Sequence, residues 1–251
     1  MIGVCIPAHN EQDDINRCLG SVRRAALHPD LQGERVKIVV VLDACTDRTA
    51  EIAGAWPVTL LRENCCNVGL ARASGARHLV AAGARWLAFT DADTVVSEAW
   101  LVHQLSLRSL VVCGTVGVAN WASHGAHAER ARANFLSGYR DRDGHRHVHG
   151  ANLGMDAQVY RRLGGFEALS CSEDQALVDK LERAGVPIAW TALPRVVTSA
   201  RPYSRVEGGF ATALRQGGKT VRSIGSAEPG LLEEPGGVAG NGLDGIDVDI
   251  L

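Results

Sequence analysis

Two carboxylates one residue apart follow the apolar run at residues 86–90. Because Asp91 and Asp93 leave a predicted strand together, both can turn toward one hard cation. Mg²⁺ and Mn²⁺ typically take one or two protein carboxylates and complete an octahedron with water and phosphate oxygens. Two aspartates in a loop are also common as solvated turn residues, and it is their position directly after a strand that favours a metal site.

Three other apolar runs also end in polar segments. These segments are PAHNE at 7–11, DACTD at 43–47 and REN at 62–64. Each alone is typical of a loop before a helix, in which Asp47 or Thr49 would be the cap. In parallel sheets, ligands bind at the carboxyl ends of the strands. Four polar strand ends along one edge therefore predict a binding site.

Two predicted helices begin with charged residues. The segment NVGLAR at 67–72 enters a helix with a glycine and Arg72 in its first turn. Free N–H groups and a guanidinium can hold a diphosphate there, although an ordinary helix start has the same composition. Glu173 and Asp174 begin another helix with Ser172 as its cap, where the helix dipole favours acidic residues in any case.

The elements that must position these residues alternate between strands and helices. Strands are predicted at 2–6, 36–42, 58–61 and 86–90, and helices at 13–26, 47 or 49–53 and 70–82. This alternation is typical of right-handed βαβ units and of a parallel sheet covered on both faces, so the fold class is α/β.

The second half of the chain is less regular. Strands are predicted at 110–118, 153–155, 188–190 and 195–198, and helices at 126–139, 157–163, 172–184 and 206–216. From residue 225 onward glycine and acidic residues dominate, and no lysine or arginine occurs. We expect a disordered tail there, because such a segment buries too little apolar surface to order itself.

Length and charge exclude several classes of protein. The chain has 251 residues, 46% of them hydrophobic, and a net charge of −2, which gives no basis for nonspecific nucleic-acid binding. We expect no membrane span, since polar residues dilute the uncharged stretch at 109–129, and no secretory signal. Seven cysteines without CxxC pairs favour free thiols in the cytosol.

Six segments in order resemble glycosyltransferase family 2. They are VCIPAHNE at 4–11, VLDACTD at 41–47, NVGLAR at 67–72, FTDAD at 89–93, GANLGM at 150–155 and CSED at 171–174. The resemblance covers roughly Ile2 to Leu214 and implies the GT-A fold, a Rossmann-like, mostly parallel central sheet with helices on both faces and an irregular acceptor-side second half. It implies one domain at 1–224, nucleotide-binding at about 1–95 and acceptor-binding at about 96–224, before the tail at 225–251.

The resemblance also implies roles for matching residues. The donor nucleotide would be bound by Pro7, Ala8, Asn10 and Glu11 around the nucleoside, Asp43 at the base, Arg72 at the diphosphate or ribose, and Asp91. Asp91 and Asp93 match the DxD motif, whose second aspartate usually holds the metal. Gly150, Ala151 and Asn152 match the segment under the donor sugar and the acceptor. Asp174 matches the general base, with Glu173 beside it.

The chain departs from the family's pattern in its C-terminal part. Some relatives supply a further metal ligand there, often a histidine, but residues 198–201 contain none, and we expect Arg201 to neutralise diphosphate charge instead. His145, His147 and His149 would share one face of a strand and could form a metal site. A mobile acceptor-side loop is the favoured interpretation of this segment.

The resemblance implies an inverting transfer of a sugar from a nucleoside diphosphate sugar, UDP rather than GDP, to a hydroxyl acceptor with the help of Mg²⁺ or Mn²⁺. The acceptor would be a sugar, a lipid-linked molecule or a small molecule, and the enzyme would be cytoplasmic or peripheral to the membrane. Two alternatives are a haloacid-dehalogenase-like phosphatase with Asp91 as nucleophile, and an inactive nucleotide-sugar-binding protein. The first conflicts with three preceding strands, and the presence of Asp93 and Asp174 argues against the second.

Overall fold

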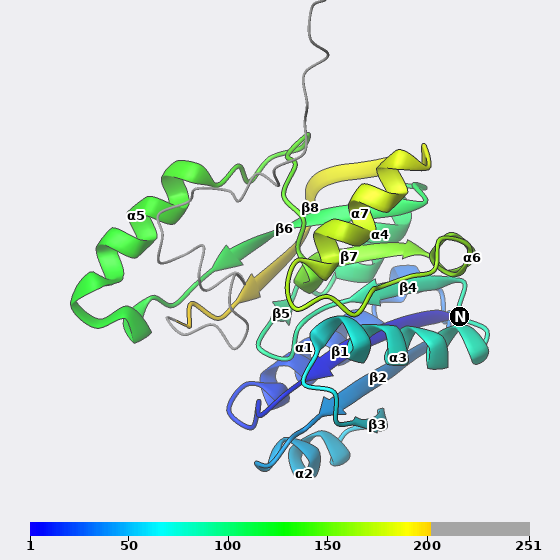
Figure 1. Cartoon of the computed structure of the whole chain (residues 1–251), viewed down its shortest axis with the longest axis horizontal. Coiled ribbons are helices and arrows are strands. Elements are labelled where there is room, and N and C mark those ends of the chain that lie inside the picture. Colours follow the sequence, from blue (N-terminus) through cyan, green and yellow to red (C-terminus); the bar gives the residue numbers. More distant parts are fainter. Residues whose placement is uncertain (202–251) are drawn as a thin grey trace, which may run out of the picture. The chain divides into compact units, whose positions relative to one another are not determined.

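The structure is a computed structural model that describes residues 1–201. The helix predicted at 206–216 and the tail predicted from residue 225 lie outside the described residues. Within the described part, eight strands form one sheet in the order β3-β2-β1-β4-β7-β6-β8-β5 (Figure 1). They are β1 (Ile2–Ala8), β2 (Val36–Asp43), β3 (Thr59–Glu63), β4 (Trp86–Phe89), β5 (Val95–Val96), β6 (Val111–Val118), β7 (Leu153–Asp156) and β8 (Ile188–Thr198).

The four strands of the first half are parallel, as the alternation of strands and helices predicts. All seven residues of β1 are buried, which is typical of a parallel strand covered on both faces. The helices that connect or follow the strands are α1 (Ile15–Ala26), α2 (Thr49–Gly54), α3 (Val68–Ala81), α4 (Trp100–Ser106), α5 (Ala128–Gly138), α6 (Ala157–Arg162) and α7 (Glu173–Arg183). Short 3₁₀ helices occur at Pro29–Leu31, Ala122–His127 and Gly150–Asn152.

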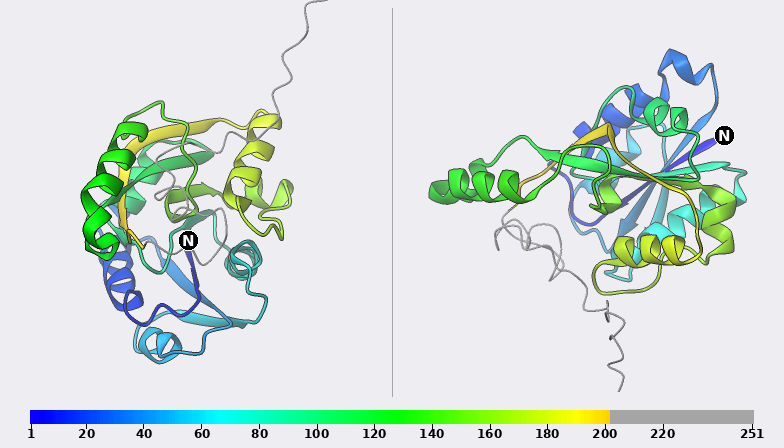
Figure 2. Two further views of the ribbon diagram at one scale, coloured as in Figure 1. Left: turned by 60° about the vertical axis from the view of Figure 1, so that its left-hand side comes forward. Right: turned by 90° about the horizontal axis from the view of Figure 1, so that it is seen from above.

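Two hydrophobic cores lie on opposite faces of the sheet because side chains alternate along each strand. Ile2, Val4 and Ile6 of β1 pack with α1, α2 and α4, whereas Cys5 packs on the other face with α3, α6 and α7. The right-hand view of Figure 2 shows these two groups of helices on opposite sides of the strands. The mostly parallel sheet with helices on both faces confirms the predicted fold class.

The second half mixes strand directions. β7 is antiparallel to both β4 and β6, β8 is parallel to β6, and β5 is antiparallel to β8. The strands predicted separately at 188–190 and 195–198 are one continuous strand, whose pairing with β6 is irregular between Gly114 and Thr115. The helix predicted at 126–139 is present as α5, Ala128–Gly138, and the 3₁₀ helix before it is kinked at Gly125, which has non-helical backbone angles.

Two helix starts differ from the predictions. Ser172 stands at the N-cap of α7 with φ 59°, but its side chain makes no capping hydrogen bond. Arg48 stands at the N-cap of α2, and Asp47 accepts instead from the N–H and hydroxyl of Thr49. β5 and α4 were not predicted at all.

Helix α5 stands away from the sheet (Figures 1 and 2). Ala131 is its buried residue, and it packs with Trp121 and Ala200 in a small separate cluster. Among residues 1–201 no helix has the length and apolar character needed to cross a bilayer.

Candidate active site

Six strands end on one edge of the sheet. β1, β2, β3 and β4 are parallel, and the two antiparallel pairings of β7 give β6, and with it β8, the same direction. The arrowheads of β1, β2, β6 and β8 accordingly point the same way in Figure 1. The loops that carry Glu11, Asp43, Asp91, Asp93 and Arg201 therefore leave the same edge, where α/β sheets bind ligands.

The turns after β1 and β2 are bonded to each other. Asn10, whose φ is 53°, accepts hydrogen bonds through Oδ1 from the backbone N–H groups of Thr46 and Asp47. The N–H of Glu11 donates to Oγ1 of Thr49 over 2.7 Å. Asn10 therefore holds the loops after β1 and β2 together. Pro7 and Ala8, the last two residues of β1, are buried directly before this turn.

Asp43, the last residue of β2, is a buried carboxylate that shapes the loop before α3. Its two oxygens accept from the N–H groups of Cys65, Cys66 and Asn67 over 2.8, 3.0 and 2.8 Å. Burial alone would raise the pKa of Asp43, but the N–H donors outweigh burial and lower it below its usual value. The carboxylate is thus fixed and ionised where the nucleobase was predicted.

Arg72 lies buried in the first turns of α3, with a side chain 4% exposed. Its Nη2 is 2.6 Å from Oδ1 of Asp91, and its Nη1 donates to Oε1 of Glu173. The guanidinium also lies over the ring of Phe166 and so close to Gly150 that a Cβ there would collide with it. Burial disfavours its charge, but the neighbouring carboxylates raise the pKa of Arg72. Arg72 thus joins the loop after β4 to the start of α7.

A second arginine joins two other carboxylates. Arg201, just after β8, contacts Oδ2 of Asp93 with Nη2 and both carboxylate oxygens of Glu11 with Nη1, over 3.0 and 3.1 Å. The other oxygen of Asp93 accepts from the hydroxyl of Thr198 over 3.3 Å. Burial raises the pKa of Asp93, with Arg201 opposing that shift. The structure therefore brings Asp91 and Asp93 to one place but pairs each with a different arginine.

The two acids at the start of α7 differ in environment. Glu173 is buried, and burial raises its pKa while its partner Arg72 lowers it. Asp174 is half-buried and accepts the N–H of Gly150 through Oδ2 over 2.8 Å. Asp174 is therefore the acid whose carboxylate is more open to a ligand.

The segment at 150–152 is buried and tightly bonded. Asn152 accepts from Nε1 of Trp100 and donates through Nδ2 to the carbonyls of Thr115 and Pro194. Its side chain therefore holds β6, β8 and α4 together. The sugar contact of Gly150, Ala151 and Asn152 stays a prediction.

The three alternating histidines do not lie on a strand, but their rings stack on one another. Nε2 of His145 faces the carbonyl of Thr191, Nε2 of His147 accepts the N–H of Arg140, and Nε2 of His149 faces the hydroxyl of Tyr139. Within the described part of the chain, no group of three or more histidine, cysteine or carboxylate side chains could hold a metal by itself. Each of the three histidine rings is held by a hydrogen bond to a neighbouring group.

Thr94 and Thr198 belong to the site but were not predicted. Their hydroxyls bond to each other over 3.0 Å and both reach Asp93. The contact depends on β8 running parallel to β6, which no local pattern in the sequence indicates.

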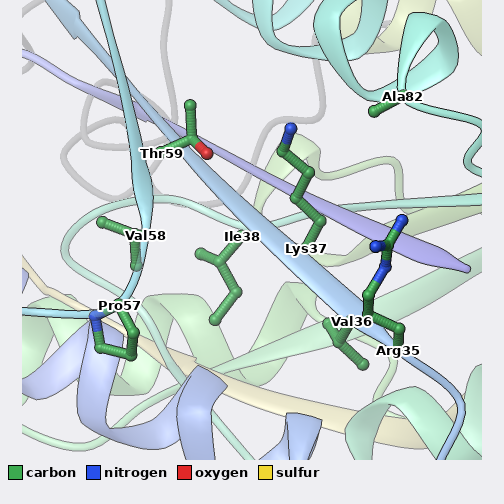
Figure 3. A pocket seen from close by; sticks show the side chains of 8 residues that line it. All are labelled: Arg35, Val36, Lys37, Ile38, Pro57, Val58, Thr59 and Ala82. Atoms are coloured by element: carbon green, nitrogen blue, oxygen red, sulfur yellow. The ribbon is translucent and has the colours of Figure 1, made fainter.

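A hollow of about 420 Å³ lies at the opposite end of the strands (Figure 3). It is lined by the start of β2, the residues entering β3 and Ala82 after α3. Lys37 in this hollow is six positions before Asp43 on β2, or about 20 Å at the rise of an extended strand. The hollow is therefore separate from the carboxyl edge.

Comparison with known proteins agrees with this architecture. The sequence model described as "Glycosyl transferase family 2" matches residues 3–164, more than half of the chain. No curated protein sequence matches significantly. The α/β fold, the polar carboxyl edge and this match together define a glycosyltransferase. The protein belongs to glycosyl transferase family 2. The match leaves no support for the phosphatase alternative.

Solved structures with similar folds are GT-A glycosyltransferases. The mannosyltransferase PcManGT from Pyrobaculum calidifontis, in complex with GDP-Man and Mn²⁺, is 20% identical with a TM-score of 0.59, over 78% of this chain and 56% of that one. TarS 1–349 from S. aureus, in complex with UDP-GlcNAc, is 16% identical with a TM-score of 0.57, over 83% of this chain and 61% of that one. The chain thus spans less than two thirds of either structure, and at these identities the likeness establishes the GT-A fold.

Proposed function

We propose that the protein is an inverting glycosyltransferase that moves a sugar from a nucleoside diphosphate sugar to a hydroxyl acceptor. The observation that carries this proposal is the meeting of five carboxyl groups and two guanidinium groups at the carboxyl edge of the sheet. The groups belong to Glu11, Asp91, Asp93, Glu173, Asp174, Arg72 and Arg201. A diphosphate adds negative charge to this acidic cluster, so its binding needs additional positive charge.

A divalent cation fits the residues present. Asp91 is one third exposed and Asp93 follows it in the same loop, and two carboxylates are what Mg²⁺ or Mn²⁺ takes before phosphate oxygens and water complete its shell. Asp91 and Asp93 would hold the cation, with Arg201 beside the diphosphate. The charge of the departing nucleoside diphosphate is what such a cation stabilises when bound.

We assign the nucleoside to the edge beside β1 and β2, with UDP favoured over GDP. Pro7 and Ala8 end β1 there, and Asp43 is held ionised by three N–H donors, ready to accept from a base N–H. Asn10 and Glu11 serve this nucleoside site through the hydrogen bonds that hold its two loops together. The fold neighbours carry GDP-Man in one case and UDP-GlcNAc in the other, so the nucleotide must be decided by titration.

Asp174 is the proposed general base. It takes the proton of the acceptor hydroxyl while that oxygen attacks the anomeric carbon, and the bond from this carbon to the diphosphate oxygen breaks with inversion. The N–H of Gly150 orients the carboxylate. Glu173 is committed to Arg72, so we assign it a positioning role rather than proton transfer.

The test combines donor binding with turnover. UDP or GDP with Mn²⁺ should raise the melting temperature, and release of nucleoside diphosphate from a panel of nucleotide sugars should give a basal rate. Asp174→Asn keeps the shape of the side chain and removes the proton-accepting charge, so turnover should fall about 100-fold or more with donor affinity nearly unchanged.

Glu173→Gln is the matched control, and it should reduce turnover less than Asp174→Asn. The reverse ranking would move the base to Glu173. Full activity in both variants would refute the inverting mechanism with a base on α7. Absence of any thermal shift with both nucleotides would refute donor binding itself.

A further inference from the structure

The ion pair at the end of β8 occupies the carboxylate oxygen that a cation on Asp93 would need. Oδ1 of Asp93 accepts from the hydroxyls of Thr94 and Thr198, and Oδ2 contacts Nη2 of Arg201. Asp93 is 8% exposed, so neither oxygen has much room for another partner. A divalent cation and the Arg201 guanidinium therefore exclude each other at Oδ2.

Asp93 cannot be left without any positive partner. Glu11 is buried as well, and two buried carboxylates without a cation would pay a large desolvation cost and repel each other. Arg201 bridges both, and its own pKa is raised by Asp93 and Glu11 against the effect of burial, so its charge is permanent. The protein thus carries a positive charge of its own at this position.

The geometry allows Arg201 to leave without unfolding the edge. Its side chain is 33% exposed, in contrast to the 4% of Arg72. The residue before it is fixed independently, because the carbonyl of Ala200 accepts from Oγ of Ser123 over 3.0 Å and faces Nε2 of His124 over 2.7 Å. The backbone can stay in place while the guanidinium moves.

We infer that Arg201 is an internal cation that competes with the divalent metal for Asp93. The guanidinium holds the Glu11–Asp93 pair in the donor-free protein, and metal binding at Asp93 would displace the guanidinium from that carboxylate. This inference rests on the proposed function, because the cation is the one that accompanies the donor. By linkage, removing Arg201 must raise the affinity of the empty protein for the metal.

The experiment measures Mn²⁺ binding without nucleotide, from the electron paramagnetic resonance signal of free Mn²⁺ in the full chain. Arg201→Met should raise the Mn²⁺ affinity about tenfold or more, and a second change, Asp93→Asn, should abolish the gain. Arg195→Met is the matched control: Arg195 lies on β8, which ends shortly before Arg201, carries the same charge and pairs with Asp141 instead. Its replacement should leave Mn²⁺ affinity unchanged.

An unchanged or lower affinity in Arg201→Met would overturn the competition. An equal rise in Arg195→Met would overturn it too, since it would reveal a general effect of charge. If Arg201→Met does not fold, Arg201→Lys takes its place, because one ammonium cannot reproduce the bridge to two carboxylates, and a smaller rise is expected.

A separate titration with UDP or GDP and Mn²⁺ tests the donor site. Failure of both nucleotides to bind the wild type would count against the proposed function, while the Mn²⁺ comparison would still decide the competition.

Discussion

His149, next to the buried segment at 150–152, should make the fold sensitive to mild acid. Burial, with His147 and His145 beside it, lowers the pKa of His149 from 6.5 to about 3. Because the folded pKa lies below the unfolded one, the unfolded chain binds more protons in this window, and stability is lost as the pH falls below about 6.5. Between pH 7 and pH 5 this group alone lowers the free energy of unfolding by about 2 kcal/mol.

The hydrogen bonds around His149 also favour its neutral form. The hydroxyl of Tyr139 accepts from the N–H of Val116, which leaves its own proton for Nε2 of His149 over 3.0 Å. A protonated imidazole would present a second donor there. Protonation therefore removes a hydrogen bond in addition to burying a charge.

The assay is urea unfolding of wild type and His149→Phe at pH 7 and pH 5, followed by circular dichroism. The pH-independent cost of the substitution cancels in the difference between the two pH values, so the variant should lose about 2 kcal/mol less than the wild type. Tyr139→Phe is the control, since it removes the hydroxyl but keeps the partly buried imidazole, and it should retain most of the acid sensitivity. Equal pH dependence in wild type and His149→Phe would refute the reasoning.

Three further predictions concern other parts of the molecule. Arg72→Met leaves Glu173 buried without its partner and should lower the free energy of unfolding by about 3–5 kcal/mol, which a denaturant titration would measure. Asp93→Ala should abolish Mn²⁺-dependent UDP binding with the circular dichroism spectrum preserved, and unchanged Mn²⁺ dependence would show that the ligand assignment is wrong. Truncation after Ser223 should preserve folding and turnover, because the residues beyond it include no lysine or arginine and many glycines. Loss of either property in the truncated chain would contradict this.

The strands and helices of the first half could be predicted because each has a recognisable pattern in its own stretch of sequence. Parallel strands buried on both faces read as continuous apolar runs, such as 2–6 and 36–42, and the polar segment after each run marks the carboxyl edge. The positions of Asp43 and Asp91 follow from that rule alone. By contrast, α4 is only seven residues long, so its buried Trp100 and Leu101 do not establish a helical period.

The pairings within the site could not be predicted because they depend on the order and direction of distant strands. Arg201 reaches Glu11 because β8 runs parallel to β6 and thus in the direction of β1, at a separation of 190 residues. An asparagine such as Asn152 is able to bind a ligand, yet its amide already makes hydrogen bonds to one indole and two backbone carbonyls. Residue type indicates which side chains are able to bind, and only the fold decides which have bonding capacity left.

The Asp-Ala-Asp segment is held from two sides by arginines of different character. Arg72, which is buried, joins Asp91 to α7. Arg201, whose side chain is partly exposed, joins Asp93 to the loop after β1. Removing a buried partner leaves an uncompensated charge, while a partner in contact with water can be replaced by another cation. Arg72 therefore holds the carboxylates of Asp91 and Glu173 together, and the inferred role of Arg201 is to neutralise Asp93 until a divalent cation replaces it.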